Sequence, residues 1–359
     1  MDKQVFQKDT RGENSYCKNI MEKRNLQLNR YRKSTIRGKK VWLIWLSLIM
    51  QVICLLAILF SLQVFGQTDR SIIDSFRLYG DVKVTFDRPA DFMATRKTIV
   101  VFFALPNGNT TDQTMGKKMQ PGDDWHFDIQ HIKAQTKFIR QQLNNNNFIV
   151  VYLENDYKSW PAWKQKHIGF RDTIPHMVDS ISSVFSKKRE VHLNGHSGGG
   201  SFIFGYLAGV RKVPGYIKRI SFLDSNYGYD STYYPKIREW ILNVNGALLN
   251  VFAYNDSIAL YNGKPFVSAT GGTWYRSHLM LKHLEEDFSF YHVTTDSMKI
   301  ARSKGNKIQF FLKYNLNRGI YHTQQVELNG FIHSVLCGTK YDSRRYSYYG
   351  RRVYDQFIE

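Results

Sequence analysis

From about residue 70 onward, short apolar runs alternate with longer segments of helical periodicity, and this alternation most constrains the fold. Strands joined by helical crossovers pair in parallel, so the pattern predicts an α/β fold, with a mostly parallel central sheet and helices on both faces. The expected strands are Lys83–Phe86, Thr98–Leu105, Phe148–Leu153, Val191–Asn194, Ile220–Leu223, Leu248–Tyr254 and Ile308–Tyr314. The expected helices are Ile129–Leu143, Asp172–Phe185, Ser201–Ala208, Ile237–Leu242 and His278–Leu284.

A long uncharged segment precedes this region. No residue between Lys40 and Asp69 carries a charge, and residues 41–66 are nearly all apolar. A hydrophobic helix of about 20 residues crosses a bilayer core, and basic residues before it favour export of the chain on its C-terminal side. An uncleaved transmembrane anchor and a cleaved signal peptide both fit. Residues 1–40 are expected to be a basic, disordered leader. Residues 67–359 are expected to be one domain outside the cytosol, either secreted, periplasmic or anchored to the membrane.

The charge balance is strongly basic, with 50 Lys and Arg against 30 Asp and Glu and a formal net charge of +20. Such a surface favours anionic partners in general. No zinc knuckle, basic zipper or RNA-binding motif accompanies the charge, so no nucleic-acid partner is expected. The basic tail 344–352 is expected to pack at the periphery. Cys337 is the one cysteine after residue 66, and neither a metal nor a cofactor is expected.

The segment Glu190–Ala208 (EVHLNGHSGGGSFIFGYLA) carries the clearest chemical pattern. Its GHSGG, centred on Ser197, fits G-x-S-x-G between a strand-like run and a helical run, which is the setting of a nucleophile elbow. The tight turn holds the serine hydroxyl clear of the sheet, and glycines beside it avoid collisions. A phosphate loop would need Lys-Ser/Thr after the glycines, and a dinucleotide fingerprint fails at Ile203. A purely structural glycine turn is the remaining alternative.

With this motif after three strands, residues from about Thr98 to Gly338 resemble the α/β-hydrolase superfamily. The resemblance implies that 98–105, 148–153 and 191–194 are the family's third, fourth and fifth strands. It also implies that Ser197 is the nucleophile and that the backbone N–H of Gly198 stabilises the oxyanion. The family's triad follows the chain order Ser, Asp or Glu, His.

The resemblance implies two alternatives each for the acid and the base. Asp256, after the strand 248–254, matches the usual place of the acid, and Asp224, after 220–223, matches a less common one. His333, where a loop is expected to enter a final helix, is preferred as the base over His322. His196 is expected to support the site rather than act as the base.

A second oxyanion donor is expected in the loop after the strand 98–105, from the backbone of Asn107 or Gly108, although the family's His-Gly dipeptide is missing there. The resemblance implies a serine esterase that acts through an acyl-enzyme on a small-molecule or polymer-linked ester. A catalytically inactive scaffold of the same fold at the cell envelope is the alternative. Aromatic residues in two predicted loops are candidates for the mouth of the site: Trp160 and Trp163 after the strand 148–153, and Trp274 after the strand 248–254.

Overall fold

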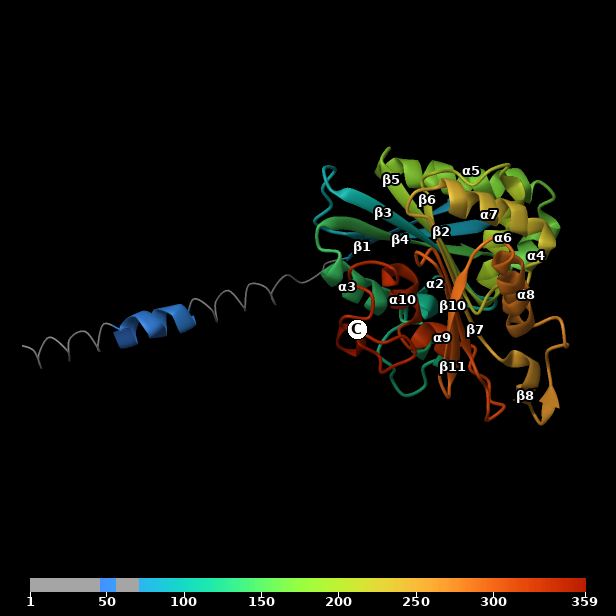
Figure 1. Ribbon diagram of the computed structural model, residues 1–359. Coiled ribbons are helices and arrows are strands. Elements are labelled where there is room, and N and C mark those ends of the chain that lie inside the picture. Colours follow the sequence, from blue (N-terminus) through green and yellow to red (C-terminus); the bar gives the residue numbers. More distant parts are fainter. Residues whose placement is uncertain (1–45, 56–70) are drawn as a thin grey trace, which may run out of the picture. The chain divides into compact units, whose positions relative to one another are not determined.

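The computed structural model describes residues 46–55 and 71–359 (Figure 1). The chain divides into two units, Met1–Thr68 and Asp69–Glu359. Residues 46–55 are helical, and the rest of the segment 41–66 lies outside the described residues. Within the described ranges no helix is both long and apolar enough to span a bilayer. The disordered leader, the anchor or signal peptide, and export therefore stay predictions.

A ten-stranded sheet forms the centre of the second unit. Its central strands, from β4 to β12, run parallel, and antiparallel strands complete both edges. In spatial order the strands are β1 (Ser71–Leu78), β2 (Val82–Pro89), β4 (Asn146–Asn155), β3 (Lys97–Ala104), β5 (Arg189–His196), β6 (Ile217–Leu223), β7 (Leu248–Tyr254), β12 (Ile308–Lys313), β11 (Met298–Ser303) and β10 (Phe290–Thr294). A separate hairpin pairs β8 (Leu260–Tyr261) with β9 (Lys264–Pro265).

The central strands are apolar on both faces because helices cover both. In β3, Val100 and Phe102 belong to one hydrophobic core, and Val101 and Phe103 belong to the other. Successive side chains of a strand point to opposite faces, so one apolar run serves two cores. The run 98–105 therefore reads as continuously hydrophobic rather than alternating.

Two sets of helices cover the sheet (Figure 1). The first core is closed by α4 (Trp160–Lys166), α5 (Phe170–Phe185), α6 (Gly200–Gly209), α7 (Tyr234–Asn243) and α8 (Thr273–Glu285). The second is closed by α2 (Thr111–Met115), α3 (Ile132–Gln142), α9 (Gln324–Glu327) and α10 (Gly330–Leu336). Short 3₁₀ helices occupy Trp125–Asp128, Ser197–Gly199, Ser231–Tyr233, Asp256–Ile258 and Asp355–Phe357.

The C-terminal tail packs on the second core. Tyr346 and Tyr354 are buried there, and Arg352 forms ion pairs with Asp128 and Glu327. The mostly parallel sheet with helices on both faces confirms the predicted fold class, an α/β-hydrolase fold. All seven expected strands and all five expected helices are present.

Candidate active site

Ser197 lies on a sharp turn between a strand and a helix. Strand β5 ends at His196, a 3₁₀ turn covers Ser197–Gly199, and α6 begins at Gly200. The φ angle of Ser197 is +54°, which is a left-handed backbone conformation. This conformation is energetically unfavourable for any residue that has a side chain. Ser197 remains partly exposed, so the turn presents its hydroxyl at the carboxyl end of the parallel strands. This is the geometry of a nucleophile elbow.

Two glycines allow that turn to pack closely. A Cβ atom on Gly199 would overlap the carbonyl oxygen of Ala104, at the end of β3. A Cβ atom on Gly200 would overlap the carbonyl oxygen of Ser225, in the segment after β6. Both obstacles are backbone atoms of the sheet region and cannot rotate away. The glycines after Ser197 therefore let α6 begin directly against the ends of the neighbouring strands.

We expect Gly199→Ala to lower the free energy of unfolding by about 2–3 kcal/mol, because the added methyl group overpacks a backbone contact. Urea denaturation followed by tryptophan fluorescence measures the change. Gly215→Ala is the matched control, because a Cβ atom there has no atom within 4 Å and needs no unusual φ. Equal effects of the two substitutions would contradict the steric argument.

The structure brings the two expected oxyanion residues together. A Cβ atom on Gly198 would overlap the side-chain amide of Asn107, so the loop after β3 lies against the residue that follows Ser197. The N–H of Gly108 donates to the carbonyl of Lys158 at 2.8 Å and is already used. The N–H of Asn107 donates to none of the described residues. Asn107 and not Gly108 therefore keeps a free backbone donor beside the elbow.

His322, the alternative base, is paired with Asp224, the alternative acid. Nδ1 of His322 lies 2.5 Å from Oδ2 of Asp224, which is fully buried. A carboxylate accepts, so Nδ1 carries the proton, and Nε2 makes no hydrogen bond to the residues that the structure describes. The imidazole of His322 is about one-quarter exposed. His322 thus has the tautomer and the access that a general base needs.

His196 ties this histidine to the elbow. The ring centroids of His196 and His322 are 4.6 Å apart, and Nε2–H of His196 donates to the carbonyl of His322 at 3.2 Å. Burial, and secondarily the neighbouring His322, lower the pKa of His196 well below its usual value, so it is neutral at pH 7. These contacts hold His322 against the residue that directly precedes Ser197 in the chain.

Asp256, the preferred acid, binds the N-terminus of α8 instead of a histidine. Its carboxylate accepts hydrogen bonds from the N–H of Thr273 at 2.8 Å and from the N–H of Trp274 at 3.2 Å. These are the first two N–H groups of α8, which have no acceptor within the helix. Burial, and then the charge of Asp224, raise the pKa of Asp256 to about 6. The hydroxyl of Thr273 contacts both carboxylates. The two aspartates are therefore neighbours, but it is Asp224 that holds a histidine.

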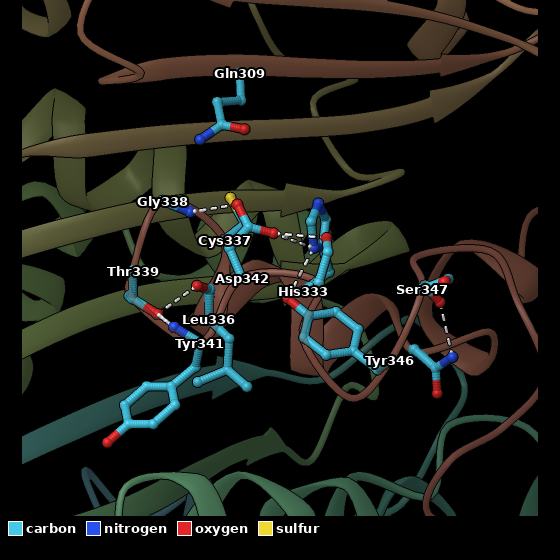
Figure 2. A network of polar contacts seen from close by, with 12 residues as sticks. Gln309, His333, Leu336, Cys337, Gly338, Thr339, Tyr341, Asp342, Tyr346 and Ser347 are labelled. Carbon is cyan, nitrogen blue, oxygen red and sulfur yellow. Dashed lines mark hydrogen bonds and ion pairs between the residues drawn. The ribbon is translucent and has the colours of Figure 1, made fainter.

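His333, the preferred base, lies in the second core on α10 (Figure 2). Its Nδ1 is 2.9 Å from the hydroxyl of Tyr346 and 3.9 Å from Asp342. Its ring stacks on Tyr348, and burial lowers its pKa. Nε2 of His333 is buried without a partner among the described residues. Asp256 and His333, the pair preferred from the sequence, therefore do not contact each other, because each side chain has other partners. The histidine and carboxylate that do form a pair are His322 and Asp224.

The tryptophans expected at the mouth are mostly packing residues. Trp160 and Trp163 are buried in the first core, where their rings pack edge to face. Trp274 is half-buried against His278. The open space beside His322 has other walls, which the sequence reasoning missed. This pocket of about 360 Å³ is lined by Tyr227, Tyr254, Tyr261, Phe266, Ile320 and His322.

The strand order and the serine turn define the class of this protein as an α/β-hydrolase fold. No family model and no curated protein sequence matches the chain. Solved esterase structures are similar to it at a distance. A thermostable esterase is 14% identical over 69% of this chain and 56% of its own, with a TM-score of 0.39, so this chain spans little more than half of that protein.

Two further similar structures match most of their own length. The feruloyl esterase module from Clostridium thermocellum is 10% identical over 75% of this chain and 90% of its own, with a TM-score of 0.43. Acetyl xylan esterase from Aspergillus awamori is 11% identical over 68% of this chain and 93% of its own, with a TM-score of 0.39.

Proposed function

We propose that this protein is a serine hydrolase that cleaves a carboxylic ester, with Ser197 as nucleophile, His322 as general base and Asp224 as the orienting acid. The observation that carries the proposal is the hydrogen bond from His322 to a buried carboxylate, beside a serine on a strained turn. A structural glycine turn needs no such pair. Asp224 fixes the His322 ring and stabilises its protonated form.

In the proposed reaction, Nε2 of His322 takes the proton from Ser197 as Oγ attacks the ester carbonyl. The backbone N–H groups of Gly198 and Asn107 stabilise the oxyanion that forms. His322 then returns the proton to the leaving alcohol, which leaves an acyl group on Ser197. Water, deprotonated by His322, attacks this acyl-enzyme and releases the acid.

A fluorophosphonate probe tests the nucleophile. An activated serine displaces fluoride and forms a stable bond between Oγ and phosphorus, so we expect peptide mapping to find the probe on Ser197. Ser197→Ala should abolish this labelling. Ser201→Ala, four residues further along the chain in α6, should be labelled like the unaltered protein. A folded protein that takes up no probe would instead support the catalytically inactive scaffold.

A further inference from the structure

The pocket beside His322 lies where substrates bind in open α/β sheets, at the carboxyl ends of the strands. Tyr227 lies three residues after Asp224, Tyr254 ends β7, and Ile320 precedes His322 in the segment after β12. Strands β6, β7 and β12 are adjacent and parallel. The pocket volume of about 360 Å³ falls in the range of small-molecule sites.

A hairpin supplies the outer wall. Asn262 and Gly263, between β8 and β9, have φ angles of +50° and +74°, as a tight two-residue hairpin turn requires. The hairpin is tied to the segment that carries Ile320, because the N–H of Leu260 donates to Arg318 and Nε of Arg318 donates to Ile258. Two hydrogen bonds thus hold the start of β8 against this segment.

The rim of the pocket is aromatic and exposed. Tyr261 is 62% exposed and Phe266 is 51% exposed, one at each side of the hairpin turn, with Ile320 at 45%. Large apolar side chains that are exposed to solvent favour binding of a ligand that buries them. Aromatic rings gain additional attraction from another ring in an offset or edge-to-face arrangement. Ile320 is the one aliphatic residue among those that line the pocket.

Tyr254 contributes a polar group, its phenol hydroxyl, to the lining of the pocket. The side chain of Tyr254 is only 1% exposed and lines the pocket, and its hydroxyl forms no hydrogen bond to another of the described residues. Burial, and then the charges of Asp224 and Asp256, raise the pKa of Tyr254, so it stays protonated and can donate. The phenol is therefore available to a polar group of a ligand in the pocket.

We propose that this pocket binds an aromatic ring that carries a polar substituent, as the acid part or the alcohol part of the ester. The proposal rests on the proposed function and names the substrate class of that site. The ring packs against Tyr261 and Phe266, and the substituent accepts the hydrogen bond of Tyr254. His322, which also lines the pocket, then faces the ester group.

Matched esters test the class and tell the two parts of the substrate apart. On the acid side, methyl 3-phenylpropanoate is compared with methyl 3-cyclohexylpropanoate. On the alcohol side, benzyl acetate is compared with cyclohexylmethyl acetate. Each pair has nearly equal intrinsic reactivity. We expect kcat/KM to favour the aromatic member at least tenfold on one side. Equal or better hydrolysis of the cyclohexyl member on both sides would overturn the proposal.

A variant tests the polar contact on the side that shows the preference. A 4-hydroxyl on the ring should raise kcat/KM, and Tyr254→Phe should lower the ratio of hydroxylated to unsubstituted ester by about five- to tenfold. Tyr291→Phe, on the exposed edge strand β10, is the matched control and should leave that ratio unchanged. An unchanged ratio in Tyr254→Phe would contradict the assigned hydrogen bond.

A binding measurement separates failure of the pocket from failure of the catalytic proposal. Titration calorimetry on the full chain with Ser197→Ala compares 3-(4-hydroxyphenyl)propanoic acid and 4-hydroxybenzyl alcohol with their saturated cyclohexyl counterparts. Tighter binding of either aromatic compound supports the pocket even if no ester is cleaved. If Ser197 is not labelled but aromatic compounds bind preferentially, only the proposed hydrolase activity is contradicted. Normal labelling and ester cleavage without aromatic preference would sink only the substrate class.

Discussion

Replacing His322 with alanine is expected to lower kcat for ester hydrolysis by about 10⁵-fold or more, the size of effect seen when a triad histidine is removed. His322 is the one group proposed here to accept the proton of Ser197 and to return it to the leaving alcohol, so both chemical steps lose their base and acid. Its ring is partly exposed and contacts the rings of His196 and Tyr227, so we expect its loss to leave the two hydrophobic cores intact. Steady-state hydrolysis of p-nitrophenyl acetate measures the rate, and urea denaturation confirms that the variant is folded.

His333→Asn is the control for this prediction, because His333 was the base preferred from the sequence. Asparagine keeps a polar group near Tyr346 but loses ring contacts with Phe252, Phe311 and Tyr348. We expect a loss of about 1–3 kcal/mol in the free energy of unfolding and a kcat within about tenfold of the unaltered protein. An inactive but folded His333→Asn, with an active His322→Ala, would reverse the assignment.

The sheet and the elbow could be predicted because each depends on local sequence. A strand buried on both faces must be apolar throughout, and β7 coincides with its expected bounds, Leu248–Tyr254. The turn at Ser197 requires glycine where the backbone of Ala104 and Ser225 approaches, and this requirement is visible as three consecutive glycines. Strands β1, β10 and β11 were missed, because edge strands β1 and β10 are largely exposed and lack an apolar run.

The choice of acid and base depended on contacts that local sequence does not encode. Asp224 and Asp256 follow adjacent parallel strands, so both carboxylates reach the same edge of the sheet. Only the path of the loop after β12, 98 residues beyond Asp224, decides which of them meets a histidine. The sequence correctly placed His333 in a final helix, but its side chain turns into the second core. The walls of the pocket were missed because its aromatic residues come from separate segments.

Asp224→Asn is expected to lower kcat by about 10⁴-fold, the effect typical of replacing the orienting aspartate of a triad by its amide. The asparagine can present an N–H to Nδ1 of His322, which would favour the tautomer that protonates Nε2 and removes the base. The fold should survive, because the Thr273 hydroxyl can still donate to the amide oxygen. Steady-state hydrolysis of p-nitrophenyl acetate measures the loss of kcat, and urea denaturation measures any loss of stability.

Asp256→Asn distinguishes this role of Asp224 from a general need for a second buried carboxylate. Asp256 accepts the N–H groups of Thr273 and Trp274, and asparagine would turn an amide nitrogen towards one of them. That unsatisfied donor should cost about 1–3 kcal/mol of unfolding free energy. It leaves the hydrogen bond of Asp224 to His322 in place, so kcat should fall less than tenfold. If Asp256→Asn abolished turnover in a folded protein while Asp224→Asn did not, Asp256 would be the acid, and the pairing of Asp224 with His322 would be only structural.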